Sequence, residues 1–247
     1  MTLQNLGKIL DRYEQQLGVG ASNNQFETLR GLPFYDWSKD TAVSGRITTF
    51  NNVLDLPLKN GQPKPLFDYE QLLFNELQSN KYLWIKKATG LGVMLKYMAW
   101  VCFHNSDKIR NSQMCIVTGP RIELAITLID RMKAPFRQNI QMHFDTKETV
   151  IELNGVHIEA YPSHHLDSMR GLTNVSFIYL DEADFFPPGQ QQDARDVSER
   201  YIAKSNPWIV LVSTPNAPDG LFEKIEREPE DTCLYKRLFL DYTYNTL

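Results

Sequence analysis

Short apolar runs alternate with amphipathic segments from about residue 66 onward. The runs have the length of strands and carry almost no charge, so each predicts a buried strand. The predicted strands are Tyr82–Ile85, Met114–Thr118, Val175–Leu180 and Trp208–Ser213. Helices are predicted between them, at Tyr69–Leu77, Met94–Phe103, Ile122–Met132 and Gln190–Lys204.

One hairpin interrupts this alternation. The segments TVIEL and VHIEAY flank Asn154-Gly155, a dipeptide favoured in two-residue β-turns. Apolar strands that alternate with helices are typical of a mostly parallel sheet covered on both faces, so the pattern predicts an α/β fold. Ligands of such sheets bind at the carboxyl ends of the strands.

The first 65 residues have a different pattern. Leu3–Leu17 carries an apolar stripe at helical spacing, and the glycine- and asparagine-rich linker GVGASNNQ follows it. An irregular segment with a short strand at Arg46–Phe50 leads to Pro65. We therefore expect a helix and an irregular wrap or lid segment over residues 1–65, and one core over residues 66–247.

Composition excludes two classes of protein. The 247 residues are 42% hydrophobic and 23% charged, which is the balance of an ordinary globular chain and not of a disordered one. No apolar run reaches the roughly 18 residues that cross a bilayer, so we expect no membrane association. Without a secretory segment the chain is expected in the cytoplasm, and its three cysteines (Cys102, Cys115 and Cys233) predict neither a disulfide framework nor a zinc site.

Charge is unevenly distributed. The chain has a net charge of -4, whereas the segment Lys81–Arg137 contains ten Lys or Arg against three Asp or Glu, a local net of +7. Such a segment is either a surface for nucleic-acid phosphates or a set of solvated helix charges. The candidate contacts are Lys108, Arg110, Lys133 and Arg137.

The sequence SFIYLDEADFF carries the strongest chemical signal. Four apolar residues place Asp181 at the end of a buried strand, with Glu182 beside it. Two adjacent carboxylates at this position suit nucleotide hydrolysis, because one can order Mg²⁺ and the other can activate a water molecule.

A glycine-containing turn between a predicted strand and a helix is the candidate phosphate loop. It occupies the register of the G-x-x-x-x-G-K-[ST] template, but Val93 stands at the lysine position and Met94 at the hydroxyl position. Two lysines stand at its entrance instead, and backbone amides near its glycines can surround a phosphate. The residues expected to bind nucleotide here are Lys86, Lys87, Ala88, Thr89, Gly90, Leu91, Gly92, Val93 and Met94.

Two further features accompany these motifs. Ser213-Thr214-Pro215 ends the last predicted strand, where hydroxyl groups can sense the γ-phosphate, although an ordinary polar turn has the same composition. Arg170, beside Gly171, precedes the acidic strand and can stabilise transition-state charge from a neighbouring subunit, or it forms a surface salt bridge.

Together these residues resemble the ATPase domain of viral large terminase subunits, the phage or provirus motors that pump DNA into a capsid. The resemblance runs from about Pro65 to about Asn245. It implies a RecA-like P-loop NTPase core of the ASCE type, with a mostly parallel sheet and helices on both faces. It also implies ATP and Mg²⁺ as cofactors.

The resemblance assigns roles to individual residues. Lys87 matches the lysine that this family often moves to the start of the loop. The remaining matches are Asp181 with the metal-ordering aspartate, Glu182 with the catalytic glutamate, Ser213 and Thr214 with the coupling motif, Arg170 with the trans-acting arginine, and Tyr69 and Gln71 with the adenine-binding motif.

As partners, the resemblance implies double-stranded DNA, a homo-oligomeric ring on a portal protein, and a small terminase subunit, all in the cytoplasm of an infected host cell. Met94 departs from the family because it offers no hydroxyl to the metal. The family's nuclease domain is not expected in this chain, which ends at DYTYNTL.

Two other functions remain open. A helicase-like DNA motor uses a similar acidic strand but needs a second RecA-like domain. A non-catalytic or weakly active nucleotide-binding or assembly module is consistent with Val93 and Met94. An α/β hydrolase is excluded because the chain lacks the G-x-S-x-G nucleophile motif.

Overall fold

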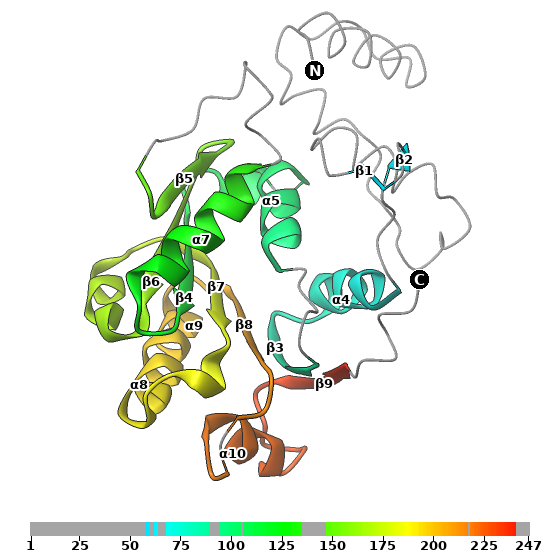
Figure 1. Cartoon of the computed structure of the whole chain (residues 1–247), viewed down its shortest axis with the longest axis vertical. Helices are drawn as coiled ribbons and strands as arrows, with labels where there is room; N and C mark the ends of the chain where they lie inside the picture. Colours follow the sequence, from blue (N-terminus) through cyan, green and yellow to red (C-terminus); the bar gives the residue numbers. More distant parts are fainter. Residues whose placement is uncertain are drawn as a thin grey trace, which may run out of the picture.

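A mixed β-sheet with helices on both faces forms the centre of the protein in the computed structural model (Figure 1). The structure describes residues 58–59, 62–63, 68–88, 94–104, 106–134, 147–216 and 218–240. In these ranges seven strands form the sheet, in the order β5-β6-β4-β7-β8-β3-β9. The predicted helix at Leu3–Leu17 and the predicted strand at Arg46–Phe50 lie outside the described residues.

The strands of this sheet are parallel except at the hairpin, where β5 and β6 pair antiparallel. Their bounds are β3 Tyr82–Lys87, β4 Gln113–Thr118, β5 Val150–Leu153, β6 Val156–Pro162, β7 Val175–Asp181, β8 Trp208–Ser213 and β9 Lys236–Leu240. A separate antiparallel pair is formed by β1 Leu58–Lys59 and β2 Gln62–Pro63.

The helices connect these strands. Their bounds are α4 Asp68–Ser79, α5 Met94–His104, α6 Ser106–Ile109, α7 Ile122–Lys133, η2 Ser163–Gly171, η3 Ala183–Phe185, α8 Pro188–Glu199, α9 Tyr201–Lys204 and α10 Leu221–Arg227. None of the described helices is long and apolar enough to cross a bilayer.

Most of the predicted elements are confirmed. The predicted helix Gln190–Lys204 is instead two helices, α8 and α9, that meet at Arg200. The predicted hairpin is present, and both of its central residues have positive φ, 51° at Asn154 and 76° at Gly155. This is the geometry of the tight turn that Asn-Gly favours.

Residues of the central strands β3, β4, β7 and β8 enter two hydrophobic cores, one on each face of the sheet. On β3, Leu83 and Ile85 join the core that contains residues of α4, α5 and α7. Trp84 points the other way, into the core that contains residues of α8, α9 and α10, where its ring lies 5.1 Å from Phe222. Neighbouring residues of β3 therefore serve opposite faces of the sheet, which matters for the two lysines at its end.

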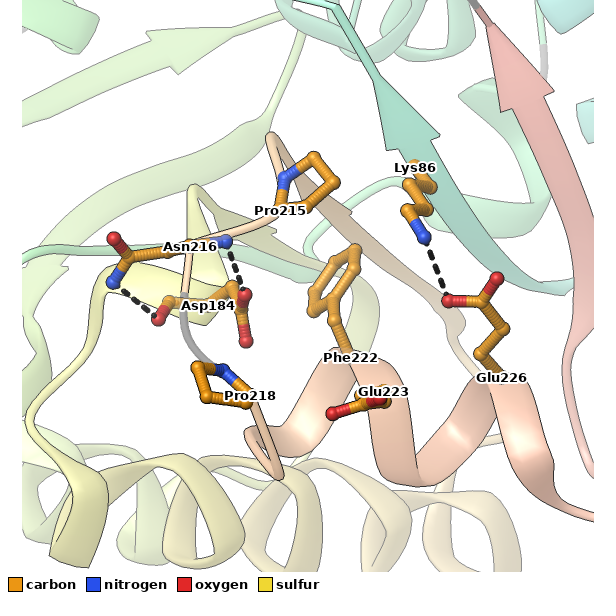
Figure 2. Close-up of a pocket in the computed structure, with 8 residues that line it drawn as sticks. All are labelled: Lys86, Asp184, Pro215, Asn216, Pro218, Phe222, Glu223 and Glu226. Carbon is orange, nitrogen blue, oxygen red and sulfur yellow. Dashed lines mark hydrogen bonds and ion pairs between the residues drawn. The ribbon is translucent and has the colours of Figure 1, made fainter.

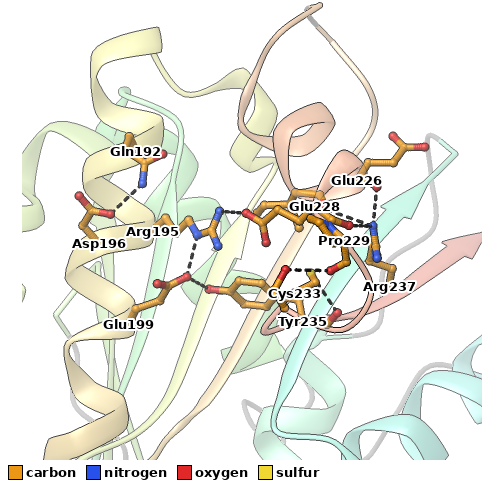
Figure 3. Close-up of polar contacts among 12 residues, drawn as sticks. Gln192, Arg195, Asp196, Glu199, Glu226, Glu228, Pro229, Cys233, Tyr235 and Arg237 are labelled. Carbon is orange, nitrogen blue, oxygen red and sulfur yellow. Dashed lines mark hydrogen bonds and ion pairs between the residues drawn. The ribbon is translucent and has the colours of Figure 1, made fainter.

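Two arginines fix the position of α10, at the bottom of the view in Figure 1. Arg237 of β9 donates hydrogen bonds to the carbonyl groups of Ile225, Glu226 and Glu228 at the end of this helix (Figure 3). Arg195 of α8 bonds to Glu228 and to Glu199, at 2.5 and 2.7 Å (Figure 3). Burial opposes the charge of Arg195, but the bonds to these carboxylates outweigh it and raise the pKa of Arg195.

Candidate functional site at the carboxyl edge of the sheet

The strand register brings the polar ends of β3, β7 and β8 together. Asp181 of β7 pairs with Val212 of β8, and Ser213 of β8 pairs with Lys86 of β3. Since the three strands are parallel, the residues that follow them lie side by side at one edge of the sheet. Both acidic residues and both lysines predicted from the sequence therefore occur at this edge.

Lys87 and Glu182 form the central contact of the site. Lys87 Nζ lies 2.6 Å from Glu182 Oε1, although the two residues are 95 positions apart in the sequence. The pair spans the end of β8, which lies between β3 and β7. The Lys87 side chain is only 9% exposed and that of Glu182 is 38% exposed, so the pair is buried on the lysine side and open to solvent on the carboxylate side.

The backbone turns sharply at Glu182. Its φ and ψ are 51° and 47°, in the left-handed region that costs a residue other than glycine about 1 kcal/mol or more. This turn directs the carboxylate over the end of β8, where Oε2 accepts hydrogen bonds from the Thr214 N–H at 2.9 Å and from the Ser213 hydroxyl at 3.3 Å. The residues predicted to couple hydrolysis to motion thus directly contact the predicted catalytic glutamate.

A second set of bonds joins the turns after β7 and β8. The Asp184 N–H donates to Ser213 Oγ at 3.2 Å, and the Asn216 N–H donates to Asp184 Oδ2 at 2.7 Å. Asp184 is 2% exposed and was not among the predicted site residues. Its signal in the sequence is a third acidic residue, two positions after Glu182, in an otherwise apolar segment.

The neighbours of Asp181 act on the pKa of its carboxyl group in both directions. The Tyr179 hydroxyl donates to its Oδ1. Burial raises the pKa of Asp181 and Glu182 adds to this effect, while the bond from Tyr179 and the charges of Lys87 and Arg131 oppose it.

A bound cation would favour the ionised form of this carboxylate. The described residues contain no group of three or more His, Cys, Asp or Glu side chains that could hold a metal ion. Mg²⁺, however, usually keeps several waters and takes one or two carboxylates together with phosphate oxygens. Asp181 therefore fits a magnesium ion that is held mainly by water and by a nucleotide.

The raised pKa of Asp181 predicts a specific pH dependence of stability. In the folded protein the Asp181 carboxyl keeps its proton above the ordinary Asp pKa of about 3.9, whereas in the unfolded chain it ionises there. The stability of wild type therefore falls as pH rises from about 3.9 through the raised pKa of the folded state. Asp181→Asn lacks this loss but still accepts the bond from Tyr179. We expect the variant to gain stability relative to wild type as pH rises from about 3.5 to 7. Urea unfolding in EDTA measures this difference, and a constant or falling difference would contradict the shift.

Lys86 lies apart from this group of residues. It points to the opposite face of the sheet and pairs with Glu226 of α10 at 2.8 Å (Figure 2). The structure therefore separates the two adjacent lysines that the sequence predicts as joint phosphate ligands. Lys86 borders a cavity of about 260 Å³ between β3, α10 and the turn after β8, which is further lined by Asp184, Pro215, Asn216, Pro218, Phe222, Glu223 and Glu226 (Figure 2).

The remaining predicted nucleotide ligands have varied positions. Tyr69 and Met94 are each 3% exposed and belong to the core beneath α4 and α5. The Ala88 N–H donates to the Leu240 carbonyl at 2.8 Å, which extends the pairing of β3 with β9. Gln71 lies in α4, and the description does not extend to its side chain; Thr89–Val93 lie outside the described residues.

Arg170 is exposed in η2, where its Nε lies 2.7 Å from Asp167 Oδ1. Two residues later, the Leu172 carbonyl accepts a hydrogen bond from Lys204, which precedes β8. This contact places the end of η2 near the amino ends of β7 and β8. The structure therefore does not bring Arg170 to the Lys87–Glu182 pair of the same chain.

The predicted DNA contacts are only partly at the surface. Lys108 and Arg110 are exposed. Lys133 is 5% exposed, and its ammonium group donates to the Lys147 carbonyl at 2.5 Å, so the proposal that it contacts DNA is wrong. It fails because Lys133 lies on the buried face of α7. Arg137 lies outside the described residues.

The three cysteines are free thiols, and Cys102 and Cys115 are buried.

The sheet order and the two helical layers define a RecA-like α/β fold. No model of a protein family matches the sequence, and no curated protein matches it. Solved structures do match, and several of them are phage proteins.

The large terminase of bacteriophage HK97 matches with a TM-score of 0.56 and 17% identity, over 81% of this chain and 44% of that one. The large terminase of a thermophilic bacteriophage matches with a TM-score of 0.57 and 11% identity, over 74% and 47%. A Thermus phage P74-26 large terminase ATPase domain has a TM-score of 0.48 and 12% identity, over 68% and 78%. The first two likenesses establish the fold that this chain shares with large terminases.

Proposed function

We propose that this chain is the ATPase domain of a viral DNA-packaging motor, a large terminase, which couples ATP hydrolysis to translocation of double-stranded DNA. The observation that carries the proposal is the contact of Lys87 with Glu182 at the carboxyl edge, where Ser213 and Thr214 hold the second oxygen of the glutamate. A cation, a general base and a sensor of phosphate loss are the parts that phosphoryl transfer requires.

In this proposal Lys87 leaves Glu182 when ATP binds and neutralises charge on the β- and γ-phosphates. The glutamate then orients the water that attacks the γ-phosphorus and accepts its proton as the bond to ADP breaks, and it passes that proton to the released phosphate. When bound, Mg²⁺ supplies charge neutralisation between the phosphates, and Asp181 holds it mainly through water. Loss of the γ-phosphate returns Lys87 to Glu182, and the Thr214 N–H and Ser213 hydroxyl carry that change into the turn after β8.

A non-catalytic nucleotide-binding module is the alternative that one observation favours. Met94 occupies the position of the metal-binding hydroxyl and is buried in the core, 3% exposed. Phosphate release from ATP, measured with Mg²⁺ and with EDTA, separates the two functions. The motor predicts release that depends on Mg²⁺, whereas ATP binding without release at saturating ATP and Mg²⁺ would favour the module.

Arg170 is expected to act on the site of a neighbouring subunit, because it lies away from the site of its own chain. Arg170→Ala and Glu182→Gln chains should each be inactive when assembled alone. An equimolar mixture restores intact sites where an Arg170→Ala chain meets a Glu182→Gln neighbour, so we expect about a quarter of wild-type hydrolysis. A mixture no more active than its components, or an equal loss in dilute monomers of Arg170→Ala, would contradict the role in trans.

A further inference from the structure

The opposite edge of the sheet, formed by the amino ends of its parallel strands, carries a group of exposed cations. We define the amino edge by four of them, Lys81, Lys108, Arg110 and Lys204, all of which are exposed. Lys81 precedes β3, Lys108 and Arg110 precede β4, and Lys204 precedes β8.

Contacts between neighbouring segments join these residues into one surface. Lys81 Nζ donates to the Asn206 carbonyl at 2.6 Å and lies 5.2 Å from the centre of the Trp208 ring. Burial and the charge of Lys108 both lower the pKa of Lys81, so the two lysines share one electrostatic environment. The surface continues toward the hairpin, because the Asn111 N–H donates to the Gly155 carbonyl at 2.8 Å.

The cations of the amino edge differ from those of the carboxyl edge in their partners. At the carboxyl edge Lys86, Lys87 and Arg227 each pair with a carboxylate. Among the described residues, none of the four amino-edge cations forms an ion pair; Lys81 and Lys204 bond to backbone carbonyl groups instead. Within the described ranges, therefore, no contacting carboxylate neutralises their positive charge.

Acidic residues also lie along this edge, among them Glu152 in the hairpin and Glu230 and Asp231 before β9. From β3 to β4, Glu76 of α4 accepts a hydrogen bond from Asn80 at 2.9 Å, Asp107 lies in α6, and Asp167 pairs with Arg170. With Arg170 included, the cations of this stretch carry five positive charges against the three negative charges of Glu76, Asp107 and Asp167. The small positive balance is therefore confined to the stretch from β3 to β4, which Glu152 borders on one side and Glu230 and Asp231 on the other.

Amides are the most exposed uncharged groups named at the amino edge, beside the half-buried rings of Tyr82 and Trp208. Three exposed asparagines, Asn111, Asn174 and Asn206, lie between the cations. The large exposed apolar side chains of the described residues are on other elements, namely Leu72, Ile122, Phe185 and Phe239. A protein interface usually centres on apolar and aromatic side chains, and single-stranded DNA binds to exposed aromatic rings. Cations and amides without such rings are typical of contacts to a duplex backbone.

We propose that the amino edge binds the sugar–phosphate backbone of double-stranded DNA through Lys81, Lys108, Arg110 and Lys204. The edge crosses β3, β8, β7, β4 and β6, and four strand spacings give it a width of about 19 Å. Backbone contacts of this kind carry no sequence preference, as a DNA-translocating motor requires. This inference rests on the proposed packaging function and places DNA at the edge of the sheet opposite the hydrolytic site.

The test measures binding of a fluorescent DNA duplex by anisotropy over a range of salt concentrations. Four phosphate contacts give a slope of log K against log salt of about -3.6, and the double variant Lys108→Gln, Arg110→Gln lowers its magnitude to about 1.8. Between 50 and 200 mM salt the affinity of the variant then falls about twelvefold less than that of wild type. These two residues are chosen because the structure describes no side-chain hydrogen bond for either.

The matched control is Lys224→Gln, Arg227→Gln, which removes two charges from α10 at the carboxyl edge. It should retain the wild-type slope, and an equal reduction in the control would overturn the assignment. Hydrolysis of ATP without DNA reports separately on the proposed function. Two results would overturn the assignment of DNA to this edge and leave the ATPase assignment standing. In the first, wild type hydrolyses ATP normally but does not bind duplex. In the second, it hydrolyses ATP normally and binds polyglutamate instead.

Discussion

Glu182→Gln is expected to slow ATP hydrolysis by about 10²- to 10⁴-fold while ATP binding persists, since this is the usual contribution of a general base. The amide can still accept hydrogen bonds from Thr214 and Ser213, so the turn is preserved, but it cannot accept a proton from water. Single-turnover phosphate release, together with the Kd of a fluorescent ATP analogue, measures the two effects separately.

The chain provides a matched control for this substitution in Glu226→Gln. Glu226 also pairs with a lysine of β3, at 2.8 Å, but it lies on the opposite face of the sheet. The control should hydrolyse ATP at close to the wild-type rate. A Glu182→Gln chain that hydrolyses as fast as the control would remove the catalytic assignment.

Lys87→Met is expected to lower kcat/KM for ATP by at least about a hundredfold, or about 2.7 kcal/mol, because it removes the cation that neutralises the β- and γ-phosphates. Methionine suits this position because the lysine stem is already buried, with 9% of the side chain exposed. Both ATP affinity and turnover should fall, in contrast to Glu182→Gln. Circular dichroism with thermal unfolding shows whether the variant is folded.

Lys86→Met is the comparison for Lys87→Met, because the two lysines are neighbours with similar ion pairs on opposite faces. The sequence alone predicts that both bind phosphate, and therefore that both variants lose activity. The structure predicts that only Lys87→Met does. An equal loss of ATP hydrolysis in the two variants would contradict the prediction that only Lys87, on the face of Glu182, binds phosphate.

Much of the fold could be predicted from the sequence because its strands are unusually apolar. VSFIYL and WIVLVS are almost wholly apolar and short, which predicts strands buried in a sheet. The residues that follow them are then predicted at its carboxyl edge. This reasoning also placed Lys87 and Glu182 at one edge. Their contact at 2.6 Å additionally depends on β8 lying between β3 and β7, which the sequence did not indicate.

The separation of Lys86 from Lys87 could not be predicted with the same reasoning. Adjacent residues of a strand face opposite sides of the sheet, and the register of β3 decides which of them faces α5. The glycine-containing loop follows both lysines and does not distinguish between them. The role of Asp184 was missed because its partners, Ser213 and Asn216, lie about 30 residues away in the sequence. Lys133 was misjudged because a lysine at the end of an amphipathic helix usually extends to solvent, whereas this one reaches a loop carbonyl.

A structure with a non-hydrolysable ATP analogue and Mg²⁺ tests the central claim most directly. The proposal predicts that Lys87 Nζ leaves Glu182 and contacts the β- and γ-phosphates, with the metal close to Asp181 and the freed carboxylate of Glu182 facing the γ-phosphate. Nucleotide bound elsewhere, or bound at this edge with Lys87 still paired to Glu182, would contradict it.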